Sequence, residues 1–374
     1  MINFNKPLVF GKEHQFVTNA LNLGKFCHGG IYSSSVELEL QTILGGKSFL
    51  VPSATAALEL SALLLDCGPN DEIIMPSFTF VSTANAFALR GVKIVFADVN
   101  RSTLNIDAKI IERLLTKKTK AVVTVDYGGV GPEYEKIQKL CHDAKVALVT
   151  DSAQSIGSSL NGKPLISFGD IGCVSFHETK NIHCGEGGAI VVNNEKMIEK
   201  ATIIRDKGTN RAQFLNGEVD KYTWQGLGSS YLSNELSAAF LYGQLQYFDR
   251  VLTHRRNVFF KYKSFFDHLS STKVVKSFSQ EPFAQETNGH MFFINFINGL
   301  ERFKFMQYML DNNIFTASHY IPLHKTRMGE KFSGEKVFLK NTEQLGDTVL
   351  RLPIWSRGTP YKKVLNALEK YTGF

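Results

Sequence analysis

Short apolar runs alternate with segments of helical spacing through the first two thirds of the chain. Runs rich in β-branched residues predict strands at residues 47–51, 71–77, 92–99, 121–127, 146–150, 171–176 and 187–194. The segments between them predict helices at residues 54–65, 79–90, 107–115, 134–144 and 195–207. This alternation is typical of βαβ units. The predicted fold class is therefore α/β, with a mostly parallel mixed sheet flanked by helices.

Both ends of the chain depart from that alternation. Residues 1–46 form a lead-in with helical spacing, and a long helix-compatible stretch follows at 235–269. The C-terminal part predicts a strand, a helix, a strand and a last helix, at residues 290–297, 301–311, 315–320 and 360–371. We therefore expect a large domain at residues 1–250, including the lead-in, and a small C-terminal α+β domain at residues 251–374.

The composition narrows the class of protein. With 374 residues, 43% of them hydrophobic, the chain is long enough to bury one large core and a smaller one. Its five cysteines are scattered without a C-x-x-C spacing, which favours reduced thiols over a disulfide framework. His177, His183 and Cys184 lie close together, but they lack the spacing of a zinc site, so we expect no metal.

The net charge and the length of the apolar runs indicate which binding partners and which cellular location to expect. The formal net charge of +7 suits a phosphorylated small ligand, because no Lys/Arg-rich block indicates nucleic-acid binding beyond a short group at 117–120. No apolar run reaches the length of a membrane span, and the N-terminus lacks the apolar region of a signal peptide. We therefore expect a cytoplasmic protein that binds neither nucleic acid nor membrane.

The carboxyl ends of two predicted strands carry the most distinctive polar residues. Asp151 follows the run at 146–150, at the usual ligand position of an open α/β sheet, and Gln154 comes shortly after it. Ser175 lies near the end of another predicted strand, and Lys180 lies in the loop beyond it. A carboxylate can hold the proton on a pyridine nitrogen and a lysine amine can bind an aldehyde, which together suit pyridoxal phosphate. Spacing alone favours the alternative, an ordinary ion pair or two solvated charges.

The start of the predicted helix at 54–65 offers a phosphate site. A helix N-terminus presents free N–H groups and a positive dipole end, and the Thr55 hydroxyl adds a donor. A plain N-cap by Ser53 is the alternative, and it is favoured unless the lysine loop belongs to a cofactor site. Phe80, near the start of the next helix, either stacks on a pyridine ring or belongs to the core.

Several separated words of the sequence occur in the order typical of one known family. They are DSAQSIG, SFHETKN and GEGG, with SATAALEL, PSFTFVSTANA and TLNID upstream. Together they resemble the sugar aminotransferase family (DegT/DnrJ/EryC/StrS type) over nearly the whole chain. SFHETKN, RDKGTNR, DKYTW, SSYL and HYIPLH are most similar to its dTDP-4-amino-4,6-dideoxygalactose transaminase branch. The resemblance implies the aspartate aminotransferase-like fold (PLP fold type I) and pyridoxal 5'-phosphate as the cofactor.

The resemblance also implies roles for individual residues. Lys180 would be the catalytic residue, which binds the cofactor covalently and later shuttles a proton. Asp151 would hold the proton on the ring nitrogen, and Phe80 would stack on the ring. The cofactor-binding residues implied are Thr55, Ala56, Phe80, Asp151, Gln154, Ser175, Lys180 and Ser230. The substrate-binding residues implied are Tyr222, Trp224, His319 and Tyr320.

The sequence departs from the family's pattern in two places. Ser230 and Leu232 stand where many members have the Asn and Arg that reach the cofactor phosphate from the partner subunit. Serine is shorter than asparagine, so the sequence does not show whether this chain makes the same contact with the phosphate. Asp126 stands where a histidine is common, and an acid near the ring would alter the local charge.

The resemblance predicts a PLP-dependent nucleotide-sugar aminotransferase that forms a homodimer with composite active sites, with the polar arm at residues 211–231 across the interface. The expected reaction moves an amino group from L-glutamate to C4 of dTDP-4-keto-6-deoxy-D-glucose. It gives dTDP-4-amino-4,6-dideoxy-D-galactose for surface polysaccharide (lipopolysaccharide or O-antigen) biosynthesis. The gluco epimer, dTDP-viosamine, and amination at C3 are the alternatives. A PLP-dependent sugar dehydratase or a non-enzymatic binding protein is less favoured, because Asp151 and Lys180 are both present.

Overall fold

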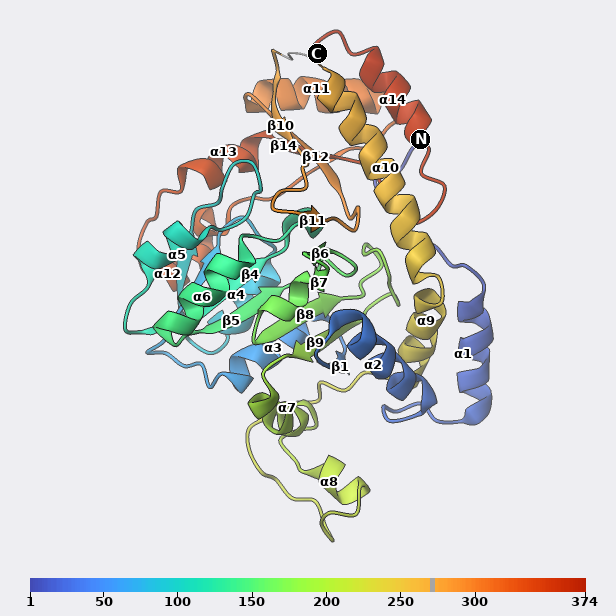
Figure 1. Cartoon of the computed structure of the whole chain (residues 1–374), viewed down its shortest axis with the longest axis vertical. Coiled ribbons are helices and arrows are strands. Elements are labelled where there is room, and N and C mark those ends of the chain that lie inside the picture. Colours follow the sequence, from blue (N-terminus) through green and yellow to red (C-terminus); the bar gives the residue numbers. More distant parts are fainter. Residues whose placement is uncertain (270–272) are drawn as a thin grey trace.

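A seven-stranded sheet forms the centre of the large domain in the computed structural model, which describes residues 1–269 and 273–374 (Figure 1). Its strands are β1 Lys47–Val51, β2 Glu72–Pro76, β3 Lys93–Ala97, β4 Thr119–Val125, β5 Ala147–Asp151, β8 Ile171–Ser175 and β9 Gly188–Val192. They lie in the order β1-β9-β8-β5-β4-β2-β3. Strand β9 runs antiparallel to both neighbours, whereas the pairs from β8 to β3 are parallel. The predicted mostly parallel mixed sheet is confirmed.

Helices cover both faces of this sheet, because alternate residues of each strand point to opposite sides. Ile73 and Met75 of β2 belong to one apolar cluster, whereas Ile74 belongs to a cluster on the other face. The first face is covered by α3 Ala54–Leu64, α4 Val81–Ala88, α7 Ile198–Arg205 and α12 Arg327–Ser333. The second is covered by α2 Ile31–Leu44, α5 Ala108–Leu114, α6 Tyr134–Ala144 and α9 Glu235–Leu245. Burial on both faces explains why the strands read as continuous apolar runs.

The small domain packs helices against a four-stranded antiparallel sheet. The strands are β10 Val275–Phe278, β12 Phe292–Phe296, β14 Val349–Leu352 and β13 Ala317–Ser318, in that order. The helices are α10 Phe248–His268, α11 Gly299–Asp311, α13 Lys340–Thr348 and α14 Tyr361–Glu369. Aromatic residues dominate its core, including Tyr262, Phe292, Phe296 and Phe305. Figure 1 shows α10 running from the large domain up to this second unit.

The remaining elements are short or lie at the periphery. They are α1 Lys12–Leu23, α8 Arg211–Leu215, the small sheet of β11 Gln285–Glu286, β6 Ser159–Leu160 and β7 Lys163–Pro164, and the 3-10 helices η1 Tyr127–Gly129, η2 Leu165–Phe168, η3 Glu195–Met197 and η4 Leu323–Lys325. Helix α1 packs against α9, and Ile2 pairs with Ile314 of the small domain. In residues 1–269 and 273–374, no helix is long and apolar enough to cross a membrane.

Two predicted elements differ in the structure. The long helix expected at 235–269 is divided into α9 and α10, because Tyr247 leaves the helical conformation and stacks on Phe10 with ring centroids 4.8 Å apart. The strand expected at 315–320 shrinks to β13, which pairs with β14 over two residues only. The domain boundary expected at residue 250 stays a prediction, and the interruption at Tyr247 lies close to it.

Candidate active site

A cavity of about 800 Å³ lies where the carboxyl ends of β4, β5 and β8 meet the small domain. Asp151 and Ser175 line it from the strand ends, and His290, His319 and Arg351 line it from the small domain. Ligands of open α/β sheets bind at this edge, and interdomain clefts are the usual place for small-molecule sites. We therefore expect the predicted site residues to lie around this cavity.

Asp151 is held in a defined orientation at the cavity wall. Its Oδ2 accepts a hydrogen bond of 2.7 Å from the Thr83 hydroxyl, and its Oδ1 accepts one of 3.2 Å from the Ala153 N–H. Burial raises the pKa of Asp151, and these two bonds together with the charge of Lys180 oppose that rise. The carboxylate is thus fixed in position by donors that favour its charged form.

Lys180 faces the same cavity from the loop after β8. Within the part of the chain that the structure describes, its Nζ makes no hydrogen bond and no ion pair, although its backbone N–H donates to His177 O at 2.9 Å. The alternative of an ordinary ion pair with Asp151 is therefore wrong. Burial lowers the pKa of Lys180 to about 8, while Asp151 acts to raise it and Arg351 to lower it further. An amine with this pKa is partly neutral near physiological pH and can act as a nucleophile.

The N-terminus of α3 forms another wall of the cavity. Ser53, Ala54 and Thr55 line it, and Ser175 joins them from the end of β8. The Ser53 side chain caps the helix by accepting from the Ala56 N–H at 3.1 Å, so the predicted N-cap is present. This bond occupies the Ala56 N–H, and Ala56 does not line the cavity. The hydroxyls of Thr55 and Ser175, with the first turn of α3, remain as donors for an anion.

A glycine in β9 permits this arrangement of α3. A Cβ atom at Gly188 would lie 2.4 Å from the carbonyl carbon of Ser53 and 2.5 Å from the Ala54 nitrogen. Any other residue would push the start of α3 away from the sheet edge. The GEGG word therefore contributes to the site through close backbone packing.

Gln154 and Phe80 also reach the cavity. The Gln154 amide is fixed at both ends, because Oε1 accepts from the Gly128 N–H at 2.7 Å and Nε2 donates to the Tyr320 hydroxyl at 3.1 Å. Phe80 is the residue before α4 and is 58% exposed, so it does not belong to the core. Its ring is available to stack on a planar group in the cavity.

His319 and Tyr320 lie together on the small-domain side. Their rings stack with centroids 3.9 Å apart and an interplanar angle of 11°. Burial, together with the charges of Arg351 and Lys180, lowers the pKa of His319 to about 2, so the imidazole is neutral. Both predicted residues thus offer neutral, partly apolar surface to a ligand.

Besides Ala56, three other predicted residues do not reach the cavity of their own chain. Tyr222, Trp224 and Ser230 belong to the arm at residues 211–231, which projects away from the sheet together with α8 (Figure 1). Trp224 is 77% exposed, and Ser230 pairs with Asp206 in an isolated bridge. Their assignment to a binding site therefore depends on a partner subunit and stays a prediction.

Asp126 is placed differently from the expectation. It is fully buried beneath the site rather than at the cavity surface, and its carboxylate accepts bonds from the hydroxyls of Tyr134, Ser152 and Ser155. Burial raises the pKa of Asp126 to about 6, and the three hydroxyls oppose the rise. Its effect is to anchor the turn that follows Asp151, since two of the three donors belong to that turn.

Several residues of the site were not predicted. Behind the cavity wall, Thr83 orients Asp151. Among the lining residues, His290 makes a 2.9 Å hydrogen bond from Nδ1 to the side chain of Asn181, and Phe4 and Arg351 close the cavity from the N-terminal segment and the small domain. No local pattern marks these three lining residues, because each is a common residue type in a segment far from Lys180 in the sequence.

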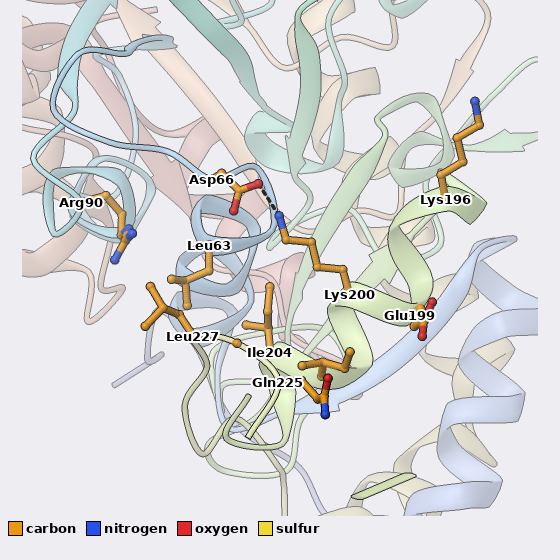
Figure 2. A pocket seen from close by; sticks show the side chains of 11 residues that line it. Leu63, Asp66, Arg90, Lys196, Glu199, Lys200, Ile204, Gln225 and Leu227 are labelled. Carbon is orange, nitrogen blue, oxygen red and sulfur yellow. Dashed lines mark hydrogen bonds and ion pairs between the residues drawn. The ribbon is translucent and has the colours of Figure 1, made fainter. Parts of the chain in front are cut away.

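A second cavity lies on a different part of the large domain (Figure 2). It measures about 390 Å³ and lies between α3, α7 and residues 225–227 of the arm. Lys200 forms an ion pair with Asp66 there, and Leu63 and Leu227 supply apolar surface. None of the predicted site residues lines it, so it is separate from the cavity that holds Lys180.

The first cavity fits pyridoxal phosphate. It combines an unpaired lysine amine, an oriented carboxylate, an exposed aromatic ring and a set of anion donors at a helix N-terminus. These are the groups that an aldehyde, a pyridine nitrogen, a planar ring and a phosphate require. Fold and site therefore define a pyridoxal phosphate-dependent enzyme of fold type I.

The sequence comparison identifies the family. Residues 10–369 match the DegT/DnrJ/EryC1/StrS aminotransferase family, and the chain belongs to it. GDP-perosamine synthase of Vibrio cholerae is 27% identical over 382 residues, which cover 99% of each protein. The dTDP-4-dehydro-2,3,6-trideoxy-D-glucose 4-aminotransferase of Saccharopolyspora spinosa is 28% identical over 338 residues, which cover 87% of this chain and 85% of the relative. The aminotransferase TlmJ of Streptoalloteichus hindustanus has a similar structure, with a TM-score of 0.88, 26% identity and 98% coverage of both chains. The protein is a PLP-dependent sugar aminotransferase.

Proposed function

We propose that this enzyme transfers the amino group of L-glutamate to C4 of dTDP-4-keto-6-deoxy-D-glucose and forms dTDP-4-amino-4,6-dideoxy-D-galactose. The observation that carries the chemistry is the free amine of Lys180 in one cavity with the oriented carboxylate of Asp151. The names of the two related enzymes described above support the choice of sugar substrate. The name of one specifies a 4-aminotransferase acting on a dTDP-linked 4-dehydro sugar, and the other is a GDP-perosamine synthase, whose name gives GDP as the nucleotide.

Different cavity residues are proposed to carry out different parts of the reaction. Bound pyridoxal phosphate supplies an electron sink for the substrate carbon that loses its proton. Lys180 would hold the cofactor covalently, and its amine, when free, would move a proton to and from that carbon. Its pKa of about 8 suits both the acid and the base role. Asp151, oriented by Thr83 and Ala153, holds the proton on the ring nitrogen.

The other cavity residues are proposed to bind the cofactor and the sugar. Thr55, Ser175 and the first turn of α3 are proposed to hold the phosphate, and Phe80 to cover one face of the ring. Gln154, which also lines the cavity, would contact the ring of the cofactor. His319 and Tyr320 would then pack against the hexose, since their stacked rings form an uncharged wall.

The arm at residues 211–231 is proposed to complete the site of a partner subunit in a homodimer. Its aromatic residues are unusually exposed for a solvent loop, with Tyr222 at 50% and Trp224 at 77%. Ser230 would approach the partner's cofactor phosphate from this arm. We further propose that the product enters surface polysaccharide biosynthesis in the cytoplasm.

The product distinguishes this proposal from its alternatives. The purified enzyme is incubated with L-glutamate and a panel of dTDP- and GDP-linked keto-sugars, and the product is identified by NMR. A small coupling between H3 and H4 indicates an axial nitrogen and the galacto product. A large coupling indicates the gluco epimer, and amination at C3 would refute the proposed reaction.

A further inference from the structure

Arg351 is a cationic residue of the active-site cavity. It lies on β14 and lines the cavity. Its Nε and Nη2 donate to the carbonyl oxygens of Ala317 and Ser318, each at 3.3 Å, and its guanidinium lies 4.5 Å from the centre of the Phe4 ring. Among residues 1–269 and 273–374, no carboxylate lies within the 4.0 Å of an ion pair with it, and its Nη1 makes no hydrogen bond.

An unpaired guanidinium in such a place is costly for the native protein. Burial lowers the pKa of Arg351, which shows that its surroundings disfavour the charge. Arginine nevertheless stays protonated in proteins, so it remains a cation that lacks a counter-ion. A buried charge is normally paired, and a missing partner inside a ligand cavity points to an anionic group of the ligand.

The neighbouring residues show where this charge acts. His290 and His319 are neutral, because burial lowers the pKa of both imidazoles. The carboxylate of Asp151 accepts hydrogen bonds from Thr83 and Ala153. The charge of Arg351 is close enough to Lys180 to lower the pKa of its amine. Arg351 therefore acts on a ligand group near the Lys180 amine.

The two substrates differ in what they place at that position. In an amino acid, the carbon that carries the transferred nitrogen also carries a carboxylate. In the keto-sugar, the carbons next to C4 carry neutral substituents, and the diphosphate lies across the sugar ring from C4. We propose that Arg351 binds the carboxylate that neighbours the transferred nitrogen of the amino donor. This assignment rests on the proposed use of an amino acid donor, L-glutamate.

The two half-reactions test this role separately. The PLP-loaded enzyme is mixed with L-glutamate in the absence of sugar, or with the amino-sugar product, and conversion of the cofactor is followed by absorbance. Arg351→Met should lower kcat/KM for L-glutamate on the order of 10- to 100-fold, as expected for the loss of a charge-assisted hydrogen bond, and leave the amino-sugar half-reaction unchanged. Arg351→Lys should restore part of the loss, because it restores the charge.

A direct binding measurement avoids turnover altogether. Glutarate is a dicarboxylate that cannot react, and calorimetry should detect its binding to the wild-type holoenzyme but not to Arg351→Met. Arg327→Met, which removes an exposed arginine from α12, is the matched control and should bind glutarate as the wild type does. Melting curves of the variants verify folding, and Arg351→Lys serves as the second variant if Arg351→Met does not fold.

The outcomes separate this inference from the proposed function. Equal loss in both half-reactions, a loss confined to the amino-sugar, or unchanged glutarate binding by Arg351→Met would overturn the role of Arg351. If L-glutamate proves not to be the donor, other L-amino acids take its place, since all carry the same carboxylate. A wild-type enzyme that reacts equally well with amines lacking a carboxylate would also overturn it. A different sugar product refutes only the proposed function.

Discussion

Replacement of Thr83 by valine tests whether Asp151 is kept ionised by its hydrogen bonds. The Thr83 hydroxyl donates its only proton to Asp151, so it must accept from the Thr79 hydroxyl, 2.8 Å away. Valine has nearly the same shape but no hydroxyl. Thr83 is 0% and Asp151 6% exposed, so bulk water has little access to replace the lost donor.

The size of the effect follows from this bond. A hydrogen bond to a charged group contributes about 1.5–3 kcal/mol, and one pKa unit corresponds to about 1.4 kcal/mol. Because the lost bond favours the carboxylate, Thr83→Val should raise the pKa of Asp151 by about one to two units above its already raised value. A protonated Asp151 cannot hold the proton on the ring nitrogen. Activity should therefore fall at a higher pH than in the wild type as the solution is acidified.

The assay is the pH dependence of kcat for the L-glutamate half-reaction. The matched control is Thr83→Ser, which keeps the hydroxyl, loses one buried methyl group and should cost about 1 kcal/mol of stability. Its pH profile should match the wild type, whereas the acid limb of Thr83→Val should be shifted upward. An unshifted profile for Thr83→Val, or the same shift in Thr83→Ser, would refute the reasoning.

Three further predictions concern the catalytic amine, the buried carboxylate and assembly. Lys180→Ala should lose the covalently bound cofactor, seen by absorbance, and many orders of magnitude in transamination, and near-normal turnover without added amine would contradict its assignment. Burial raises the pKa of Asp126 to about 6. Relative to the unfolded chain, its ionisation therefore costs the native state about 3 kcal/mol, a cost that is absent below about pH 4, grows between about pH 4 and pH 6, and is fully present above that range. Melting curves of Asp126→Asn should consequently vary less than those of the wild type over this range, and an unchanged pH dependence would exclude Asp126 as the cause. Sedimentation should show a homodimer, and a stable monomer that still transaminates would argue against a role of the arm at 211–231 in a partner's site.

The order of strands and helices in the large domain was predictable from the sequence. Strands buried on both faces must be apolar along their length, and the helices between them must present one apolar stripe. Both requirements produce regular patterns of apolar residues that can be recognised in the sequence. The small domain was predicted less well, because its strands β10 and β13 are short and partly exposed, so they carry too few residues for a clear period.

Asp151 and Lys180 were identified from the sequence because they belong to distinctive local words, and a strand end places such residues at a predictable edge. Arg351, Thr83 and Phe4 were not, because their approach to Lys180 depends on how separate segments pack. The small domain brings Arg351, and the N-terminal segment brings Phe4, to the sheet edge through contacts between positions far apart in the chain, and Thr83 reaches Asp151 across 68 positions of the sequence. The sequence alone thus determined the fold class and singled out Asp151 and Lys180 as candidate reactive groups. The tertiary structure decided which residues orient and charge the cavity, since burial and electrostatic environment arise only when distant segments come together.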